Sequence, residues 1–213
     1  ALKENIFTIE TINLHDFGID NRKSIDDEPF GGGPGMILRP DVVEKALLSA
    51  SKNKSIKSTK IYLTPSGPLL DQQKLGIFAK LDEIIILCGR FEGVDQRAID
   101  ILGFEEVSIG DYVLAGGEIA AQVLLEGCIR LIPGVLGHPK SLLEESFSNN
   151  LLEYPQYTRP KVWEDSLGNK HDVPEVLTSG HHGNITKWRL DKSVTKTKKI
   201  RPDLYIKKEQ EQD

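Results

Sequence analysis

Short apolar runs that end in glycine-bearing turns, with helical stretches between them, constrain the fold of this chain more than any other feature. Residues 61–63 (Ile-Tyr-Leu) and 83–88 (Glu-Ile-Ile-Ile-Leu-Cys) are such runs, and residues 106–109 (Glu-Val-Ser-Ile) indicate a third. A continuous apolar run is typical of a strand buried on both faces, and strands that alternate with helices favour a parallel sheet. We therefore expect an α/β fold with a largely parallel sheet.

Three stretches around these runs have the apolar spacing of amphipathic helices: residues 41–51, 71–79 and 118–131. The side chains expected to face inward are Val42, Val43, Ala46 and Leu47 in the first stretch, Leu75 and Phe78 in the second, and Ile119, Val123, Leu124 and Ile129 in the third.

The character of the chain changes after Pro133-Gly134. Residues 137–150 are polar with few apolar anchors, which indicates a linker or a mobile loop. A polar, proline-rich segment at 154–174 then leads to Asn184, which we expect to be the N-cap of a helix. This pattern predicts a small, mainly helical second domain.

Charge is distributed unevenly along the 213 residues. The net charge is −5, but from His181 onward nine basic residues face five acidic ones, so this segment carries +4 and the rest carries −9. Trp188 and Tyr205 lie among the basic residues. Such a segment suits a polyanion such as RNA, although a charge run on a terminal helix is more often a solvated face.

Other features bear on compartment and metal content. The apolar stretches, such as residues 84–88, are far shorter than the roughly 20 residues of a membrane helix, and no signal segment is visible, so we expect a cytoplasmic protein. Cys88 and Cys128 lack the spacing of a zinc site, and we expect reduced, buried thiols. His181-His182 has no third ligand at metal spacing.

Three glycine-bearing turns follow the predicted strands, at residues 64–67, 88–93 and 108–118. No G-x-x-x-x-G-K-[ST] occurs, and no G-x-G-x-x-G follows a strand, which disfavours an ordinary Rossmann enzyme. Ligands of open parallel sheets bind at the carboxyl ends of the strands, and glycine leaves backbone groups open to close approach. Together the turns favour a nucleoside-like ligand, although each alone is compatible with simple turn punctuation. The glycine-rich run at 30–36 is either a lid or a tight connection.

Five longer motifs resemble, in the same order, those of the TrmD family of tRNA (guanine-N(1))-methyltransferases. They are YLTP (62–65), CGRFEGVD (88–95), SIGDYVL (108–114), IPGVLG (132–137) and YTRP (157–160). The resemblance covers nearly the whole chain. It implies a parallel α/β sheet with a C-terminal trefoil knot of the SPOUT type. It also implies an obligate homodimer that uses S-adenosylmethionine to methylate the guanine immediately 3′ of the tRNA anticodon.

The same resemblance implies a knotted catalytic domain at 1–136, a linker at 137–150 and a helical tRNA-binding domain at 151–213. It makes Glu145 the base that takes the guanine N1 proton and Arg130 the cation that stabilises charge on the neighbouring oxygen. Without it, Glu145 would be a solvated linker acid and Arg130 a helix C-terminal cation. The active site is expected to be shared between subunits. The implied cofactor-binding residues are Tyr62, Leu63, Thr64, Pro65, Gly89, Glu92, Ser108, Ile109, Gly110, Tyr112, Leu114, Gly116 and Gly117.

The chain departs from the family pattern in three places. It begins Ala1-Leu2-Lys3, without the family's opening strand and L-F-P-x-M-F segment. Phe91 stands where the family commonly has Tyr, and Glu145 stands where it has the proposed catalytic Asp. A glutamate is one methylene longer, so its backbone must lie slightly further from the guanine. Mg²⁺ can assist the family reaction, but no carboxylate cluster marks a site, so no metal ligand is assigned.

Two other functions remain open on the sequence. One is a SPOUT methyltransferase that acts on another RNA. The other is a nonenzymatic module that binds RNA or a nucleotide.

Overall fold

The computed structural model describes residues 5–51, 58–136, 145–147 and 149–210. The chain divides into two compact units, residues 1–137 and 138–213. Of the expected linker, residues 137–144 and 148 lie outside the described residues. Within the described residues, no helix combines the length and the apolar character needed to cross a lipid bilayer.

The first unit is built on a parallel sheet of three strands. Its order is β4-β3-β5, with β3 at Thr59–Leu63, β4 at Ile84–Cys88 and β5 at Glu105–Val107. In the centre, Tyr62 pairs with Leu87 on one side and Glu106 on the other. The predictions of an α/β fold and a parallel sheet are confirmed.

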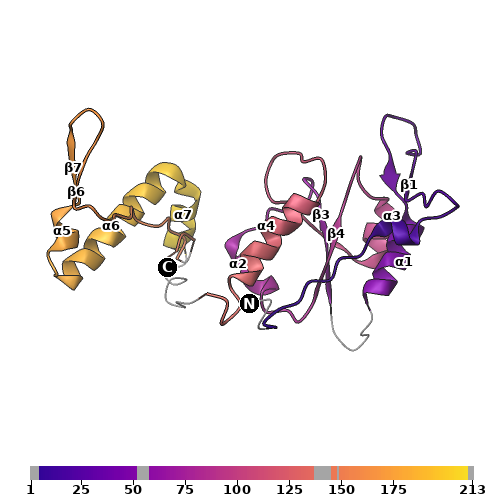
Figure 1. Ribbon diagram of the computed structural model, residues 1–213, viewed down its shortest axis with the longest axis horizontal. Coiled ribbons are helices and arrows are strands. Elements are labelled where there is room, and N and C mark those ends of the chain that lie inside the picture. The colour runs from indigo at the N-terminus through magenta and orange to yellow at the C-terminus, as the bar shows by residue number, and fades with distance from the viewer. Residues whose placement is uncertain (1–4, 52–57, 137–144, 148, 211–213) are drawn as a thin grey trace. The chain divides into compact units, whose positions relative to one another are not determined.

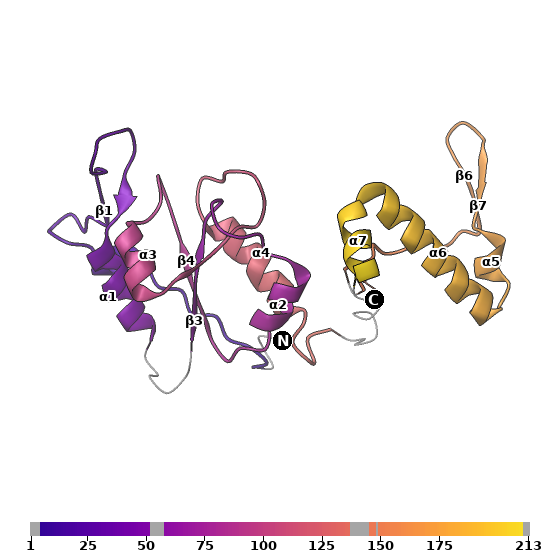
Figure 2. The same ribbon diagram turned by 180° about the vertical axis from the view of Figure 1, so that it is seen from behind.

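Two pairs of helices cover the two faces of this sheet (Figures 1 and 2). The helices α1 (Pro40–Ala50) and α3 (Gln96–Leu102) lie on one face, and α2 (Gln72–Phe78) and α4 (Glu118–Ile129) lie on the other. Successive strand side chains point to opposite faces, so Tyr62 joins the first core. Ile61 and Leu63 join the second, which also contains Phe78, Val107, Ala120, Ala121, Leu124 and Cys128.

The expected inward stripe of α4 is wrong at two positions. Ile119 and Val123 are 57% and 47% exposed, although Leu124 is fully buried as expected. The buried side of α4 is made mainly of small side chains, which let the helix lie close to the sheet and to α2. At the α2 contact, a Cβ on Gly127 would meet Leu75 at 2.7 Å. Helical spacing alone predicts that the larger apolar side chains of α4 are buried. The close packing of α4 instead buries mainly its smaller side chains.

Other expected boundaries shift by one or two residues. Helix α1 begins at Pro40, which suits the first helical position because its missing N–H would have no intrahelical partner there. Strand β5 ends at Val107 rather than residue 109. Strand β4 is half-buried over most of its length because it lies at one end of the strand order. Only β3 therefore matches fully the expectation of strands buried on both faces.

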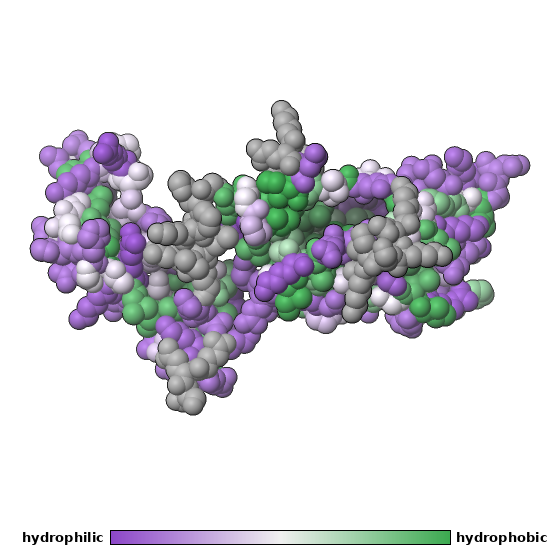
Figure 3. Space-filling model, turned by 90° about the horizontal axis from the view of Figure 1, so that it is seen from below, coloured by the Kyte–Doolittle hydropathy of each residue, from purple (hydrophilic) through white to green (hydrophobic). Residues whose placement is uncertain are grey.

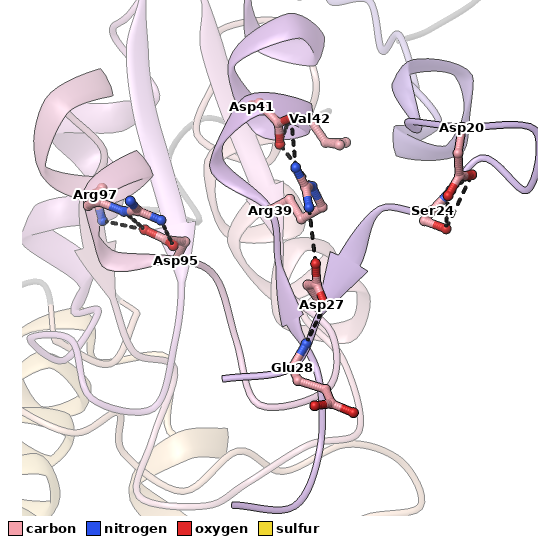
Figure 4. Close-up of polar contacts among 9 residues, drawn as sticks. All are labelled: Asp20, Ser24, Asp27, Glu28, Arg39, Asp41, Val42, Asp95 and Arg97. Carbon is pink, nitrogen blue, oxygen red and sulfur yellow. Dashed lines mark hydrogen bonds and ion pairs between the residues drawn. The ribbon is translucent and has the colours of Figure 1, made fainter. Parts of the chain in front are cut away.

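A small N-terminal layer packs on α1. It consists of the 3-10 helix η2 (Leu14–Phe17) and an antiparallel pair, β1 (Asp26–Asp27) and β2 (Ile37–Leu38). Arg39 donates hydrogen bonds to Asp27 and to Asp41 of α1, each at 3.1 Å, and so ties the pair to the helix (Figure 4). The Arg39 guanidinium lowers the pKa of Asp41 because it favours the ionised carboxylate.

In its described residues, the second unit contains a hairpin and three helices. The strands are β6 (Val162–Glu164) and β7 (Lys170–Asp172), and the helices are α5 (Glu175–Thr178), α6 (His182–Ile200) and α7 (Pro202–Gln210). The hairpin was not predicted, because its strands are short and largely polar. Helix α6 begins at His182 with His181 as its N-cap, so the expected N-cap at Asn184 is three residues too late.

Replacement of Ile61 by Ala should test how much the centre of the sheet stabilises the first unit. Ile61 is fully buried, so Ile61→Ala should lower the free energy of unfolding by about 2–5 kcal/mol through lost contacts and a cavity. Ile77→Ala on α2, where the side chain is 62% exposed, should change it by less than about 1 kcal/mol. Equilibrium urea unfolding measures both. Equal losses in the two variants would contradict the packing described above.

Candidate active site

The turns after β3, β4 and β5 meet at one end of the sheet, at the top of the first unit in Figure 1. They enclose a cavity of about 240 Å³. All thirteen residues implied as cofactor-binding by the resemblance line this cavity. Its wall also includes Arg90, Phe91, Gly93, Val107, Val113, Ala115 and Ala120.

Backbone hydrogen bonds hold these turns against one another. The Thr64 N–H donates to the Val107 carbonyl at 3.0 Å, which joins the first turn to the end of β5. The Gly117 N–H donates to the Gly89 carbonyl at 2.9 Å, which joins the third turn to the second. Since these bonds need no particular side chain, the shape of the cavity depends on how closely the backbones approach.

Ser108 shapes the entry into the third turn. Its hydroxyl is almost fully buried, donates to the Gly110 carbonyl at 3.1 Å and lies 3.2 Å from the Gly110 N–H. The Ser108 N–H donates to the Pro68 carbonyl at 2.9 Å, so the chain leaves the pairing with β3 at this point. This bonding explains why β5 is shorter than the apolar run predicts.

Two glycines leave little space for a side chain at the junction of the turns. A Cβ on Gly89 would lie 3.0 Å from the Tyr62 ring, which would have to shift, and a Cβ on Gly117 would lie 2.9 Å from the Cα of Cys88. The second contact is with backbone, so an added methyl group would have to push two turns apart. Close approach therefore requires the glycine at position 117, and turn punctuation alone does not explain it.

One ion pair spans the second and third turns. The Arg90 guanidinium donates to Glu118 at the start of α4, with 2.8 Å between Nε and Oε1. Both side chains are about half exposed, so the pair contributes at most about 1 kcal/mol. Sequence reasoning did not select either residue. The spacing of Arg90 and Glu118 in sequence gives no signal that their turns meet.

Phe91 also lines the cavity and has an unusual backbone conformation. Its φ is +57°, a left-handed value that is rare for a bulky residue, and its side chain is 61% exposed. The conformation is held on both sides, because Gly93 N–H donates to the Arg90 carbonyl and Glu92 N–H donates to the Met36 carbonyl, each at 3.0 Å. Strained residues of this kind gather at functional sites.

The glycine-rich run at 30–36 is a tight connection at its second end. Gly35 lies directly against the Glu92 side chain, where a Cβ would approach within 2.2 Å. Gly31, Gly32 and Gly33, by contrast, have no atoms within 4 Å of a Cβ. The run therefore packs against the second turn at Gly35. Its first residues face solvent, and Phe30 is 99% exposed.

Burial makes the thiols and the phenol near the site poor nucleophiles. It raises the pKa of Tyr62 and of Cys88, and raises the pKa of Cys128 to about 11, because the ionised forms lose hydration. Both cysteines are free thiols. Cys128 is buried as expected, while Cys88 is only half-buried. In the part of the chain that the structure describes, no group of three or more His, Cys, Asp or Glu residues could hold a metal ion.

Arg130 and Glu145 belong to different units. Arg130 is the C-cap of α4, and its N–H donates to the Glu126 carbonyl at 3.2 Å. Glu145 is half-buried in a turn of the second unit. Neither residue lines the cavity described above.

Comparison with known proteins places the chain in a family. The family model for tRNA (Guanine-1)-methyltransferase TrmD matches residues 1–207. The chain belongs to the TrmD family. It is therefore a tRNA (guanine-N1)-methyltransferase, an enzyme class in which S-adenosylmethionine is the methyl donor.

Individual TrmD relatives match the chain along nearly its whole length. A tRNA (guanine-N(1)-)-methyltransferase of Ruegeria sp. (strain TM1040) is 49% identical over 205 residues, which cover 96% of this chain and 82% of the relative. The enzyme of the same name from Wolbachia pipientis subsp. Culex pipiens is 48% identical, with coverages of 96% and 86%. That of Rhizobium etli is 45% identical, with coverages of 100% and 88%.

A methyl group added at Gly117 should impair this TrmD cavity. Gly117→Ala should weaken S-adenosylmethionine binding by about tenfold or more, because the added Cβ forces the second and third turns apart. Gly76→Ala on α2, where a Cβ meets open space, is the matched control and should bind like wild type. Calorimetry without tRNA measures both affinities. Wild-type affinity in Gly117→Ala would show that the cofactor does not depend on the closeness of these turns.

Proposed function

We propose that this enzyme methylates N1 of the guanine immediately 3′ of the tRNA anticodon, with its cofactor in the cavity of the first unit and with Glu145 and Arg130 as catalytic residues. The observation that carries the proposal is the single cavity at the carboxyl ends of β3, β4 and β5, lined by all thirteen residues implied by family resemblance. From the family resemblance, we also assign residues 1–136 to the catalytic domain, 137–150 to the linker and 151–213 to the tRNA-binding domain.

The residues of the cavity suit S-adenosylmethionine. Close approach at Gly89 and Gly117 leaves backbone N–H and C=O groups to read a flat base edge, and Leu114 and Ile109 add apolar surface. The Glu92 carboxylate favours a cationic ligand electrostatically. When bound, S-adenosylmethionine supplies a methyl group on a positively charged sulfur.

The protein has to remove the proton from guanine N1 for methyl transfer to occur. Guanine N1 carries a proton at neutral pH and is a poor nucleophile until that proton leaves. In the proposal the Glu145 carboxylate takes the N1 proton while the bond from N1 to the methyl carbon forms and the bond from that carbon to the sulfonium sulfur breaks, which leaves the sulfur as a neutral thioether. The Arg130 guanidinium stabilises the negative charge that develops on the adjacent carbonyl oxygen of the base.

The second unit has the side chains expected of an RNA-binding surface. Lys192 lies over the Trp188 ring at 5.8 Å, and Arg189 lies over the Tyr154 ring at 4.7 Å. Tyr157 packs against Trp188 with 6.3 Å between ring centroids. Cations attract the phosphate backbone, and aromatic faces stack on unpaired bases, as in many proteins that bind single-stranded loops. These contacts support tRNA binding by residues 151–213.

Exposed apolar side chains on the first unit support a homodimer. Ile119 and Val123 of α4 are about half exposed, and Val113 in the third turn is 84% exposed. Hydrophobic patches are also visible on this unit from below (Figure 3). Apolar patches on a soluble unit mark interfaces. We assign the exposed side chains of Ile119, Val123 and Val113 to an interface with a second copy of the chain, and the turns to the trefoil knot of the SPOUT fold, on the strength of the family resemblance.

Variants at the two proposed catalytic residues should separate chemistry from binding. Arg130→Ala and Glu145→Gln should each lower turnover by about two orders of magnitude or more, since each removes charge stabilisation or proton transfer. S-adenosylmethionine affinity should remain nearly unchanged. Methyl transfer from labelled cofactor to tRNA transcripts measures turnover, and calorimetry measures affinity.

Conservative changes and altered transcripts provide the controls for these variants. Glu145→Asp restores the residue typical of the family and should stay active, whereas wild-type turnover in Glu145→Gln would eliminate Glu145 as the base. A transcript with adenine in place of the target guanine should not be labelled. Labelling of that transcript at another site, or of ribosomal RNA alone, would favour a methyltransferase with a different RNA substrate.

Mixed dimers should reveal whether the active site is shared between subunits. Glu145→Gln and Gly110→Trp are each expected to be inactive, because one lacks the base and the other fills the cavity. If Glu145 acts at the partner's cavity, a mixed dimer contains one site with both lesions and one intact site. Random reassociation of equal amounts should then restore roughly a quarter of wild-type activity.

The reassociation experiment needs proof that mixed dimers form. Different affinity tags on the two variants allow tandem purification of the mixed species. Inactive mixed dimers would show that each site is built within one chain.

A further inference from the structure

The described residues that follow Glu145, 146–147 and 149–151, include two with a strained backbone. Phe147 and Asn150 have left-handed φ values of +75° and +53°, which non-glycine residues seldom adopt. The Phe147 N–H donates to the Leu151 carbonyl at 2.7 Å and closes the turn. Such strain persists only where neighbouring groups fix the conformation.

Several hydrogen bonds attach this turn to its surroundings within the second unit. The Glu153 N–H donates to the Ser146 hydroxyl at 3.0 Å, which ties the residue next to Glu145 to the chain that follows the turn. The Leu152 N–H donates to the Thr197 hydroxyl of α6 at 2.8 Å. A third bond runs from the Lys196 ammonium to the Glu153 carbonyl at 3.1 Å.

Thr197 is the buried member of this set. Its side chain is fully buried on α6, and its hydroxyl donates to the Ser193 carbonyl one turn earlier at 2.7 Å. Since the single hydroxyl proton is used in that bond, the oxygen lone pairs are left to accept the Leu152 N–H. A fully buried hydroxyl with both roles occupied fixes its partners more strongly than an exposed lysine.

We propose that Thr197 is a positioning residue for methyl transfer: its buried hydroxyl anchors the Glu145 turn to α6. Helix α6 also bears Trp188, Arg189 and Lys192, so the helix that carries these side chains, which we assign to tRNA, is hydrogen-bonded to the chain that follows the Glu145 turn. The position of the Glu145 carboxylate would then be set by the helix that binds the RNA. This inference rests on the proposed role of Glu145 and adds a residue that does not touch the substrate.

The hydroxyl can be tested with two nearly isosteric variants. Thr197→Val keeps the shape but removes the acceptor, and Thr197→Ser keeps the acceptor. In Thr197→Val we expect kcat on tRNA to fall by about 10- to 100-fold, with KM for tRNA and the affinity for S-adenosylmethionine changed less than about twofold. Thr197→Ser should retain wild-type kcat to within about threefold. A purely structural role would instead lower the folded fraction and leave kcat per folded molecule unchanged, which thermal unfolding and active-site titration determine.

A double-mutant cycle tests whether Thr197 acts through Glu145. In the Glu145→Gln background, Thr197→Val should produce almost no further loss of kcat, because the group that it positions is already gone. Hydrogen exchange provides a readout independent of activity. The Leu152 amide should exchange as slowly as amides of α6 in wild type and Thr197→Ser, and much faster in Thr197→Val.

Different outcomes refute different claims. Wild-type kcat in Thr197→Val, together with a strong loss in Glu145→Gln, would overturn the positioning role and leave the base intact. Wild-type kcat in Glu145→Gln would overturn the base itself. If Thr197→Val does not fold, Ser146→Ala releases the other side of the same turn, and an unchanged kcat there would count against the proposal.

Discussion

The pairing of β3 with both of its neighbours is the constraint on which the catalytic unit depends. Residues on alternate faces of β3 enter two separate cores, so Tyr62 anchors α1 and α3 while Ile61 and Leu63 anchor α2 and α4. Because β4 and β5 run parallel to β3, the three turns that follow must emerge at the same edge. The cavity lies where these three turns meet, so it is a consequence of the parallel arrangement of the strands.

Small groups at the junctions then determine the shape of the cavity. Gly89 and Gly117 let the backbones of two turns come into contact, and the small buried side chains of α4 let that helix approach the sheet. Phe91 lines the same cavity with a left-handed backbone, which the hydrogen bonds on either side of it hold in place.

The residues that we propose for the chemistry lie in both units. The first unit holds the cavity and Arg130, whereas the second holds Glu145 together with the aromatic and basic side chains of α6. In the proposed mechanism, a base on the RNA-binding unit meets the methyl donor only when tRNA is correctly placed. The anchoring of the Glu145 turn by Thr197 gives this division a structural basis.

By itself, the sequence determined the three strands of the parallel sheet, the helices α1, α2, α4 and α6 to within a few residues, and the three glycine turns, because periodicity and turn composition are local. It did not predict α3 or the β6–β7 hairpin. Its long motifs also identified the family. The tertiary structure decided which apolar side chains of α4 are buried, where β5 ends, and that Arg90 meets Glu118. It also revealed that the Thr197 hydroxyl accepts a hydrogen bond from the N–H of Leu152, more than forty residues earlier. Such contacts join segments distant in sequence, and no local pattern specifies them.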